Sequence, residues 1–284
     1  MTSSSNGLMP DFLVVGTQKA GTTWLMRKLG AHPDVYMAPR QLHYFDREYH
    51  RGIDWYRAQF AAATPGQIIG EKTTEYFDTA TIDTVAPRFA ETCPDAKFIV
   101  ILRNPVERAW SALIHHVNAG LVALPRDPQQ AVFDDTHRAC NANHHFRFIE
   151  RGFYARQLRT LFDHVDPSRV LVLVFEEDIV ADPEAGWAKV CDFLGLPEAE
   201  LVDGNRPENR VRLSPLACRA AFRVRRIPRA RGVLRRIDRL LGLNPWTPKM
   251  TPETRTRLQE TYQAPNRELF ALLGRDIASW KDPL

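Results

Sequence analysis

The sequence predicts an α/β fold in which a central, mostly parallel sheet is flanked by helices. The predicted strands are short, continuous apolar runs rather than alternating ones, which is typical of strands buried on both faces. Helical patterns separate these runs along the chain, and this order indicates strand–helix–strand units. We expect one domain over residues 11–284, preceded by a flexible tail at residues 1–10.

Four apolar runs are predicted to be strands, at residues 12–15, 67–70, 98–102 and 170–175. In parallel sheets, ligands bind beyond the carboxyl ends of the strands. The functional residues are therefore expected in the segments that follow the four runs, which are Gly16–Thr23, Glu71–Tyr76, Arg103–Arg108 and Glu176–Asp178.

Capping residues predict where several helices begin and end. The segment from Thr22 to about Ala31 has a helical apolar pattern directly after the first strand. Asn104 and Pro105 suit the N-cap and first position of a helix that follows the third strand. Near the fourth strand, Asp182 is a predicted N-cap, and Gly195 is a stop signal.

The composition favours a globular protein with an anionic ligand. Hydrophobic residues make up 44% of the 284 residues and charged residues 25%. The formal net charge is +4, which suits an anion without indicating nucleic acid. The cysteines lack zinc-ligand spacing and are expected to be reduced; they are Cys93, Cys140, Cys191 and Cys218. Neither a membrane span nor a signal peptide is predicted, so we expect a cytoplasmic location.

One segment is strongly basic, with nine arginines and one acidic residue between Arg219 and Arg239. Its apolar residues repeat at helical spacing and predict an amphipathic helix within a basic arm or lid at about 214–246; they are Val233, Leu234, Ile237, Leu240 and Leu241. Two interpretations are open. The charges form a solvated face, or the arm meets an anionic ligand or a membrane surface.

The first predicted strand runs into a glycine loop that suits a phosphate or sulfate group. Gly16 and Gly21 flank four residues, as in the nucleotide-binding pattern G-x-x-x-x-G-K-[ST], but Thr22 occupies the lysine position and Lys19 lies inside the loop. Backbone N–H groups at a helix N-terminus bind anions through hydrogen bonds and the helix dipole. Lys19 adds a positive charge to this cradle.

The third strand predicts a second anion site. It ends in Arg103 rather than in the aspartate that holds magnesium in many nucleoside triphosphatases. Arginine binds phosphate through two parallel hydrogen bonds. Ser111 lies eight residues further, on the predicted helix. Two anion sites without a carboxylate for a metal indicate a ligand with two separate phosphate groups and no required metal.

These segments resemble the PAPS-dependent sulfotransferases, which use 3′-phosphoadenosine 5′-phosphosulfate as donor and release PAP. "GTQKAGTTWL" resembles their 5′-phosphosulfate loop, and "ILRNPVERAWSALIHH" resembles their 3′-phosphate motif. "HPDVYMAPRQLHYFD", "GEKTTEYF", "RGFYARQL", "VLVFEED" and "NRELFALLGRDIASW" are similar to further segments. The resemblance covers most of residues 11–202 and 249–280, and is strongest to bacterial and heparan-sulfate enzymes. It implies a single P-loop-like domain.

The resemblance also implies roles for individual residues. Lys19 matches a lysine at the bridging and 5′-phosphate oxygens, Arg103 and Ser111 match 3′-phosphate ligands, and Lys72 matches a lysine near the acceptor. The expected cofactor-binding residues are Gln18, Lys19, Ala20, Gly21, Thr22, Thr23, Trp24, Arg103, Ser111, Tyr154, Arg210 and Arg212. Arg210 and Arg212 are included because the Lys-Gly-Arg loop of the heparan-sulfate enzymes is missing here.

The acceptor side departs from the family pattern. Gln41 stands where many relatives place a glutamate, and an amide cannot accept a proton. His43 is the expected base, and Asp46 and Glu71 are held in reserve. We expect catalytic roles for Lys19, His43 and Lys72. The expected substrate-binding residues are Gln41, His43, Tyr44, Phe45, Asp46, Lys72 and Tyr76.

The predicted function is transfer of a sulfuryl group from PAPS to a hydroxyl, less readily an amine, of a small-molecule, sugar or lipid acceptor. Two alternatives predict other behaviour. A P-loop-type kinase would bind ATP and depend on magnesium. A non-enzymatic binder of nucleic acid or an anionic surface would use the arginines of residues 219–239 and lose binding steeply with salt. Nucleic acid is not an expected partner, whereas peripheral membrane contact is compatible with the sequence.

Overall fold

The computed structural model describes residues 8–134, 147–197, 213–227 and 230–280. The predictions for residues 1–7, Cys140, Arg210, Arg212 and Arg229 lie outside these ranges. The chain forms two compact units. The first comprises Met1–Asn104, Tyr154–Asn205 and Asn266–Leu284, and the second comprises Pro105–Phe153 and Arg206–Pro265.

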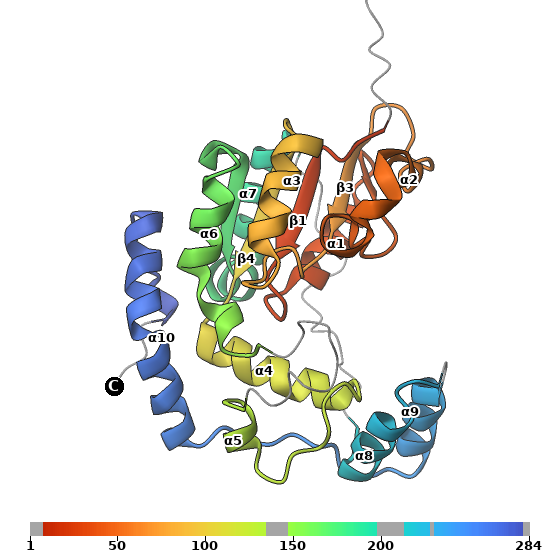
Figure 1. The fold of residues 1–284 in the computed structure, drawn as a ribbon, viewed down its shortest axis with the longest axis vertical. Helices are drawn as coiled ribbons and strands as arrows, with labels where there is room; N and C mark the ends of the chain where they lie inside the picture. The colour runs from red at the N-terminus through yellow and green to blue at the C-terminus, as the bar shows by residue number, and fades with distance from the viewer. Residues whose placement is uncertain (1–7, 135–146, 198–212, 228–229, 281–284) are drawn as a thin grey trace, which may run out of the picture. The chain divides into compact units, whose positions relative to one another are not determined.

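The first unit contains a five-stranded sheet in the order β2-β3-β1-β4-β5 (Figure 1). All four pairings are parallel, which confirms the predicted α/β class with a parallel sheet. The strands are β1 (Phe12–Gly16), β2 (Val35–Met37), β3 (Ile68–Lys72), β4 (Lys97–Leu102) and β5 (Val170–Val174). Sequence analysis predicted four of them and missed β2, which has only three residues.

Helices cover both faces of this sheet, which explains its continuous apolar strands. Leu13 and Val15 of β1 face one side and pack in a core with α3 (Ile82–Thr92) and α6 (Tyr154–Phe162). Phe12 and Val14 face the other side and pack in a core with α1 (Thr22–Ala31) and α7 (Pro183–Leu194). Side chains alternate between the faces of a strand, so a strand buried on both faces needs apolar residues at every position.

Short helical segments complete the first unit. The connection from β2 to β3 carries the π-helix η1 (Tyr44–Glu48), the 3-10 helix η2 (Tyr49–Arg51) and α2 (Gly52–Ala58). Around β5 lie η5 (Pro167–Arg169) and the π-helix η6 (Phe175–Ala181), and η7 (Ala278–Trp280) closes the described chain. The predicted caps of α7 are confirmed: the Asp182 carboxylate accepts a hydrogen bond from the Ala185 amide at 2.9 Å, and Gly195 ends the helix with φ 74°.

The second unit is helical in its described part and has its own core. It contains α4 (Pro105–Asn118), α5 (Pro128–Ala131), η4 (Glu150–Gly152), α8 (Pro215–Arg223) and α9 (Ala230–Leu240). The boundary between the units falls within α10 (Pro252–Leu273), at Pro265. Val106, Leu113, Cys218, Leu258 and Tyr262 belong to this core. Within the predicted arm at 214–246, the described residues form two helices, α8 and α9, and the residues after Leu240 are turn or irregular. Among the described helices, none has the length and apolar character needed to cross a membrane.

Candidate active site

The loop between β1 and α1 has the backbone form of an anion cradle. Lys19 and Gly21 have φ values of 73° and 85°, so both lie in the left-handed region. A β-carbon on Gly21 would lie 2.8 Å from the Phe175 ring, which leaves no space for a side chain there. Gly21 is the N-cap of α1, and no side chain caps this helix end. The amide groups of the first turn therefore point outward with the positive end of the helix dipole.

Arg103 braces this loop from the end of the neighbouring strand β4. Its Nη1 donates a hydrogen bond to the Lys19 carbonyl oxygen at 2.8 Å, and its guanidinium carbon lies 4.9 Å from the centroid of the Phe175 ring. Tyr154 donates its hydroxyl to the Arg103 carbonyl oxygen at 2.8 Å. A non-glycine residue in the left-handed region needs such support, because that conformation costs about 1–2 kcal/mol. Arg103 thus holds Lys19 in place.

The loop residues fit a bound phosphosulfate. The side-chain Oε1 of Gln18 is buried and lacks a hydrogen-bond partner in the described part of the chain. Because oxygen and nitrogen of an amide are assigned from their partners, this end of Gln18 can also present an N–H to an anion. Ala20 and Thr22 are buried, so their contribution to a ligand would come mainly from backbone N–H groups. Trp24 packs at the edge of the core on the α1 side of the sheet.

His43 and Asp46 form a pair beside the carboxyl end of β3. His43 Nδ1 lies 3.1 Å from Asp46 Oδ2, and the Asp46 side chain is only 3% exposed against 19% for His43. The His43 amide donates to Thr73 Oγ1 at 3.4 Å, and the Thr73 amide donates to the Val14 carbonyl oxygen at 3.1 Å. This chain of contacts places the pair at the same sheet edge as the β1–α1 loop. A carboxylate on Nδ1 favours the tautomer in which Nε2 accepts protons.

Glu71 is the centre of a buried network below this segment. Its carboxylate accepts hydrogen bonds from the hydroxyls of Tyr56, Tyr76 (2.7 Å) and Thr73 (2.9 Å). Burial raises the pKa of Glu71 from its ordinary value, while the three hydroxyl donors favour the ionised form. Glu71 is 0% exposed. It therefore fixes the segment that bears Thr73 rather than meeting an acceptor.

Gln41 and Lys72 also belong to this edge. Gln41 Oε1 accepts hydrogen bonds from the amide and the hydroxyl of Thr74, at 3.1 and 3.2 Å. Its acceptor oxygen is thus engaged, and an amide has no basic lone pair to take a proton. Lys72 is the last residue of β3, and its side chain is half-buried.

Three predicted substrate-binding aromatics lie in the core instead of on a surface. Tyr44, Phe45 and Tyr76 are 3%, 0% and 0% exposed. The ring of Tyr44 stacks on Tyr56 with centroids 4.1 Å apart, and Phe45 meets Tyr76 edge to face at 5.5 Å. Their rings therefore shape the segment that carries His43, and any effect on an acceptor is indirect.

The predicted 3′-phosphate ligands fall in separate parts of the chain. Arg103 directly follows β4 in the first unit, and Ser111 lies on α4 in the second unit. Arg210 and Arg212 lie outside the described residues. Binding of the 3′-phosphate by Arg103 and Ser111 therefore stays a prediction.

Two supporting residues follow β5 (Val170–Val174), and sequence analysis gave neither of them a specific role, although it placed Glu176 in a segment where functional residues were expected. Phe175 contacts the guanidinium of Arg103 and fills the space beside Gly21. Glu176 accepts hydrogen bonds from the Asn104 amide at 3.0 Å and from the Trp280 indole at 2.9 Å. Phe175 is the last residue of the fourth predicted strand and Glu176 is the next residue, so the carboxyl end of that strand was the signal in the sequence.

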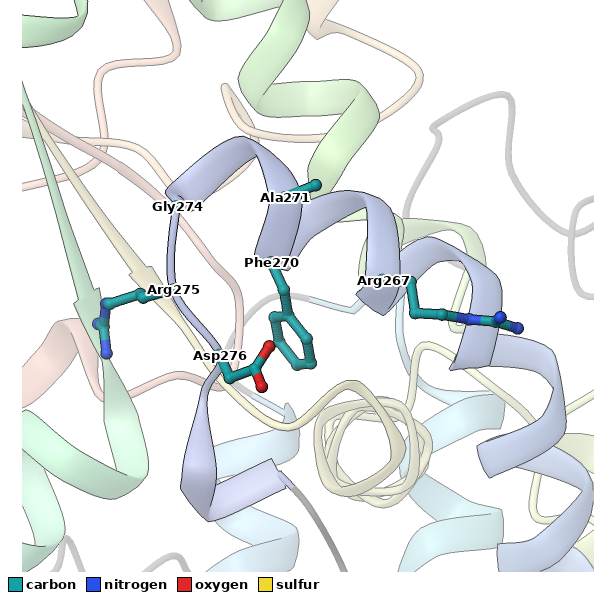
Figure 2. A pocket seen from close by; sticks show the side chains of 6 residues that line it. All are labelled: Arg267, Phe270, Ala271, Gly274, Arg275 and Asp276. Atoms are coloured by element: carbon teal, nitrogen blue, oxygen red, sulfur yellow. The ribbon is translucent and has the colours of Figure 1, made fainter.

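Two cavities of the first unit lie away from the glycine loop. One, of about 870 Å³, is bordered by Asp11, Ile68 and Lys97, which stand at the amino ends of strands. The other, of about 460 Å³, lies at the end of α10 (Figure 2). Figure 2 shows that its two arginines, Arg267 and Arg275, point away from Phe270 and Asp276. Arg275 donates to Glu177 at 3.1 Å, so this cavity is not built around an anion.

Comparison with known proteins identifies the family. The profile of the sulfotransferase domain family matches residues 9–214. The chain is 32% identical over 277 residues to "Heparan sulfate glucosamine 3-O-sulfotransferase 6" of Homo sapiens, covering 94% of this chain and 73% of the human protein. It is 30% identical over 274 residues to "Heparan sulfate glucosamine 3-O-sulfotransferase 3B1" of Mus musculus. That match covers 95% of this chain and 64% of the mouse protein.

A solved structure has the same fold over nearly the whole chain. The sulfotransferase from Alicyclobacillus acidocaldarius superposes with a TM-score of 0.72 at 23% identity, covering 97% of this chain and all of that one. The family profile covers both the glycine loop and Arg103, which follows the adjacent strand. The match therefore agrees with the resemblance of the sequence motifs to sulfotransferases. The chain belongs to the sulfotransferase domain family, whose enzymes depend on PAPS.

Proposed function

We propose that this protein transfers the sulfuryl group of PAPS to a hydroxyl of a sugar-containing acceptor, with His43 as the general base. The observation that carries the proposal is the β1–α1 loop, in which an uncapped helix end, a left-handed Lys19 and the bracing Arg103 lie together. When bound, PAPS supplies the sulfuryl group and the leaving phosphate. The first-turn amides and the Lys19 ammonium suit the charge that grows on that phosphate.

His43 suits proton removal from the acceptor. Asp46 orients its ring through Nδ1, and Nε2 is left to take the proton of an attacking hydroxyl. Asp46 also lies 3.4 Å from Arg47 Nε, so the carboxylate is held from two sides. Gln41 cannot serve as base, and Glu71 is enclosed by three hydroxyl donors. Among the groups considered at this edge, His43 combines partial exposure with an orienting carboxylate.

A sugar hydroxyl is favoured over other acceptors by the named relatives. Both 3-O-sulfotransferases described above carry glucosamine in their names. The buried aromatics Tyr44, Phe45 and Tyr76 offer no exposed aromatic wall for a phenol in the described structure. Small-molecule phenols and lipid hydroxyls are the alternatives that the acceptor screen must separate.

The donor half of the proposal is tested with the Lys19→Ala variant. Removing one donor to a developing anion typically lowers turnover about 100- to 1,000-fold, and we expect at least this loss in kcat. Lys249→Ala, which removes an exposed lysine of the second unit, is the matched control and should keep wild-type turnover. Near-normal turnover of a folded Lys19→Ala protein would contradict the assignment.

The acceptor half is tested by incubating the enzyme with labelled PAPS and separate panels of glucosaminides, phenols and lipid alcohols. Label appearing on the sugar panel supports the proposal, and label appearing only on another panel overturns the acceptor class. Calorimetry with PAP and with magnesium–ATP distinguishes the sulfotransferase from the alternative of a P-loop-type kinase. Heat with magnesium–ATP but none with PAP would discard the donor assignment as well.

A further inference from the structure

The α8–α9 region concentrates the exposed apolar side chains of the protein. Nine large hydrophobic residues are exposed in the described part of the chain, and seven of them fall between residues 216 and 243. Single exposed leucines are ordinary, whereas a cluster indicates an interaction surface. The seven are Leu216, Ile227, Val233, Ile237, Leu240, Leu241 and Leu243.

Four of these residues form one continuous stripe on α9 and its end. Val233, Ile237 and Leu241 are spaced four residues apart, so they lie on the same side of the helix, and Leu240 lies beside them. They are 55%, 46%, 61% and 85% exposed in the order Val233, Ile237, Leu241 and Leu240. We call these four residues the apolar stripe.

A buried polar contact fixes the rotation of α9 so that the stripe faces outward. Asp238 is 8% exposed, and its carboxylate accepts hydrogen bonds from the amide and hydroxyl of Ser214, at 2.9 and 2.5 Å. Ser214 in turn caps α8 by accepting from the Ala217 amide at 3.2 Å. Leu234, four residues before Asp238, packs on the core of the second unit. The side of α9 that carries Leu234 and Asp238 faces the protein, and burying the stripe instead would break the Ser214–Asp238 contact.

Positive charge lies along one border of the stripe and on the polar side of α9. Residues 219–239 carry nine arginines and one aspartate, a net +8 in a chain of formal net charge +4, so the remainder of the chain carries −4. The one aspartate is Asp238, which is bound to Ser214. Arg236, three residues from Val233 and four from Leu240, borders the stripe, and Arg235 and Arg239 occupy the polar side of α9. All three are exposed.

From these observations we infer that α8 and α9 dock the protein on an anionic lipid bilayer. An apolar stripe bordered by arginines is the pattern of a helix that lies in the plane of a membrane interface. The stripe contacts the acyl boundary, and the arginines bind lipid phosphates. A sulfated glycan or nucleic acid would engage the arginines and leave the stripe in water. A second copy of this surface would bring two strongly positive faces together. The inference is independent of the proposed acceptor and of His43.

The test is co-sedimentation of the full chain with two kinds of vesicle. One kind contains phosphatidylcholine alone, and the other contains phosphatidylcholine and phosphatidylglycerol in equal parts. We expect binding to the anionic vesicles that weakens as salt increases, and little binding to phosphatidylcholine alone. The variant Ile237→Ser/Leu241→Ser keeps every charge and should reduce binding at least about tenfold, because it removes two apolar anchors. Arg235→Gln/Arg239→Gln should reduce it about 25-fold, at about fivefold per arginine.

Matched controls separate this surface from the rest of the molecule. Arg156→Gln/Arg159→Gln removes two exposed arginines of α6 and should bind as the wild type does. Val180→Ser removes an apolar residue that is 57% exposed outside the region and should also bind normally. Thermal melting confirms that each variant is folded.

Three results would overturn the inference. The first is a wild-type protein that stays in the supernatant with anionic vesicles at low salt. The second is a serine variant that binds vesicles as tightly as the wild type, since the arginines would then act alone, as they would on a sulfated glycan such as heparin. The third is a wild-type dimer that the serine variant converts to a monomer, because the stripe would then be an interface between copies.

Discussion

At the scale of single residues, the proposed general base is His43, with Asp46 as the carboxylate that orients its ring. We expect His43→Ala to lower kcat at least about 100-fold, because general-base catalysis contributes factors of about 100 to 10,000. Asp46→Asn should keep the ring in place but change its preferred tautomer, and should lower kcat by a smaller factor. Measuring kcat against pH for the three proteins checks both expectations.

Gln41 provides the rescue experiment for the same hypothesis. A Gln41→Glu substitution keeps an acceptor oxygen for the two Thr74 donors and adds a basic carboxylate at the position where the family often has one. In the His43→Ala background it should restore part of the lost turnover. A His43→Ala enzyme with unchanged kcat would instead assign the base to another group.

At the scale of elements, we expect opposite effects of the same substitution at two glycines: Gly21, the N-cap of α1, and Gly30, within the helix. Gly21→Ala forces a β-carbon into the left-handed region and against Phe175, so we expect a loss of about 1–2 kcal/mol in the free energy of unfolding and weaker PAP binding. Gly30 is exposed, and its β-carbon would meet nothing within 4 Å. Gly30→Ala should therefore add about 0.5–1 kcal/mol. Urea unfolding and calorimetry with PAP measure both effects, and equal behaviour of the two variants would contradict the role of Gly21.

The Glu71 network makes the stability of the β3 edge depend on pH. Burial raises the pKa of Glu71 above its ordinary value of 4.5, so the folded state holds this proton more tightly than the unfolded chain does. The free energy of unfolding contributed by Glu71 is therefore full below pH 4.5 and falls as pH rises through the raised pKa. Glu71→Gln removes this titration. The wild-type value minus the Glu71→Gln value, from urea unfolding at several pH values, should decrease with pH. An increase would mean that the three hydroxyls hold Glu71 ionised.

At the scale of the whole molecule, the sequence predicted the features that depend on residues close together in the chain. The four longer strands and the caps of α7 depend on neighbouring residues, and their predictions are confirmed. The glycine loop was located from the same kind of local pattern, and its anion-binding role stays a prediction. The strand β2 was missed because three residues are too few to carry a periodic signal. The bond from Arg103 to the Lys19 carbonyl joins residues 84 positions apart, which no local pattern encodes. Tyr44, Phe45 and Tyr76 were predicted at a surface because aromatic residues near a predicted site suit either a pocket or a core, and only tertiary packing distinguishes the two.

Ligand-linked stability is the measurement at this scale that tests the predicted 3′-phosphate contact. A ligand that binds only the folded state stabilises it by about 2.7 kcal/mol at a concentration 100 times its Kd. PAP should therefore raise the melting temperature more than adenosine 5′-phosphate does at equal concentration, because it carries the additional phosphate expected at Arg103 and Ser111. Ser111→Ala should reduce the PAP effect and leave the adenosine 5′-phosphate effect unchanged. Arg103→Ala should weaken both, because Arg103 also braces Lys19 in the loop. If Ser111→Ala changed neither ligand, the serine would have no part in the 3′-phosphate site, while the loop assignment would stand on Lys19.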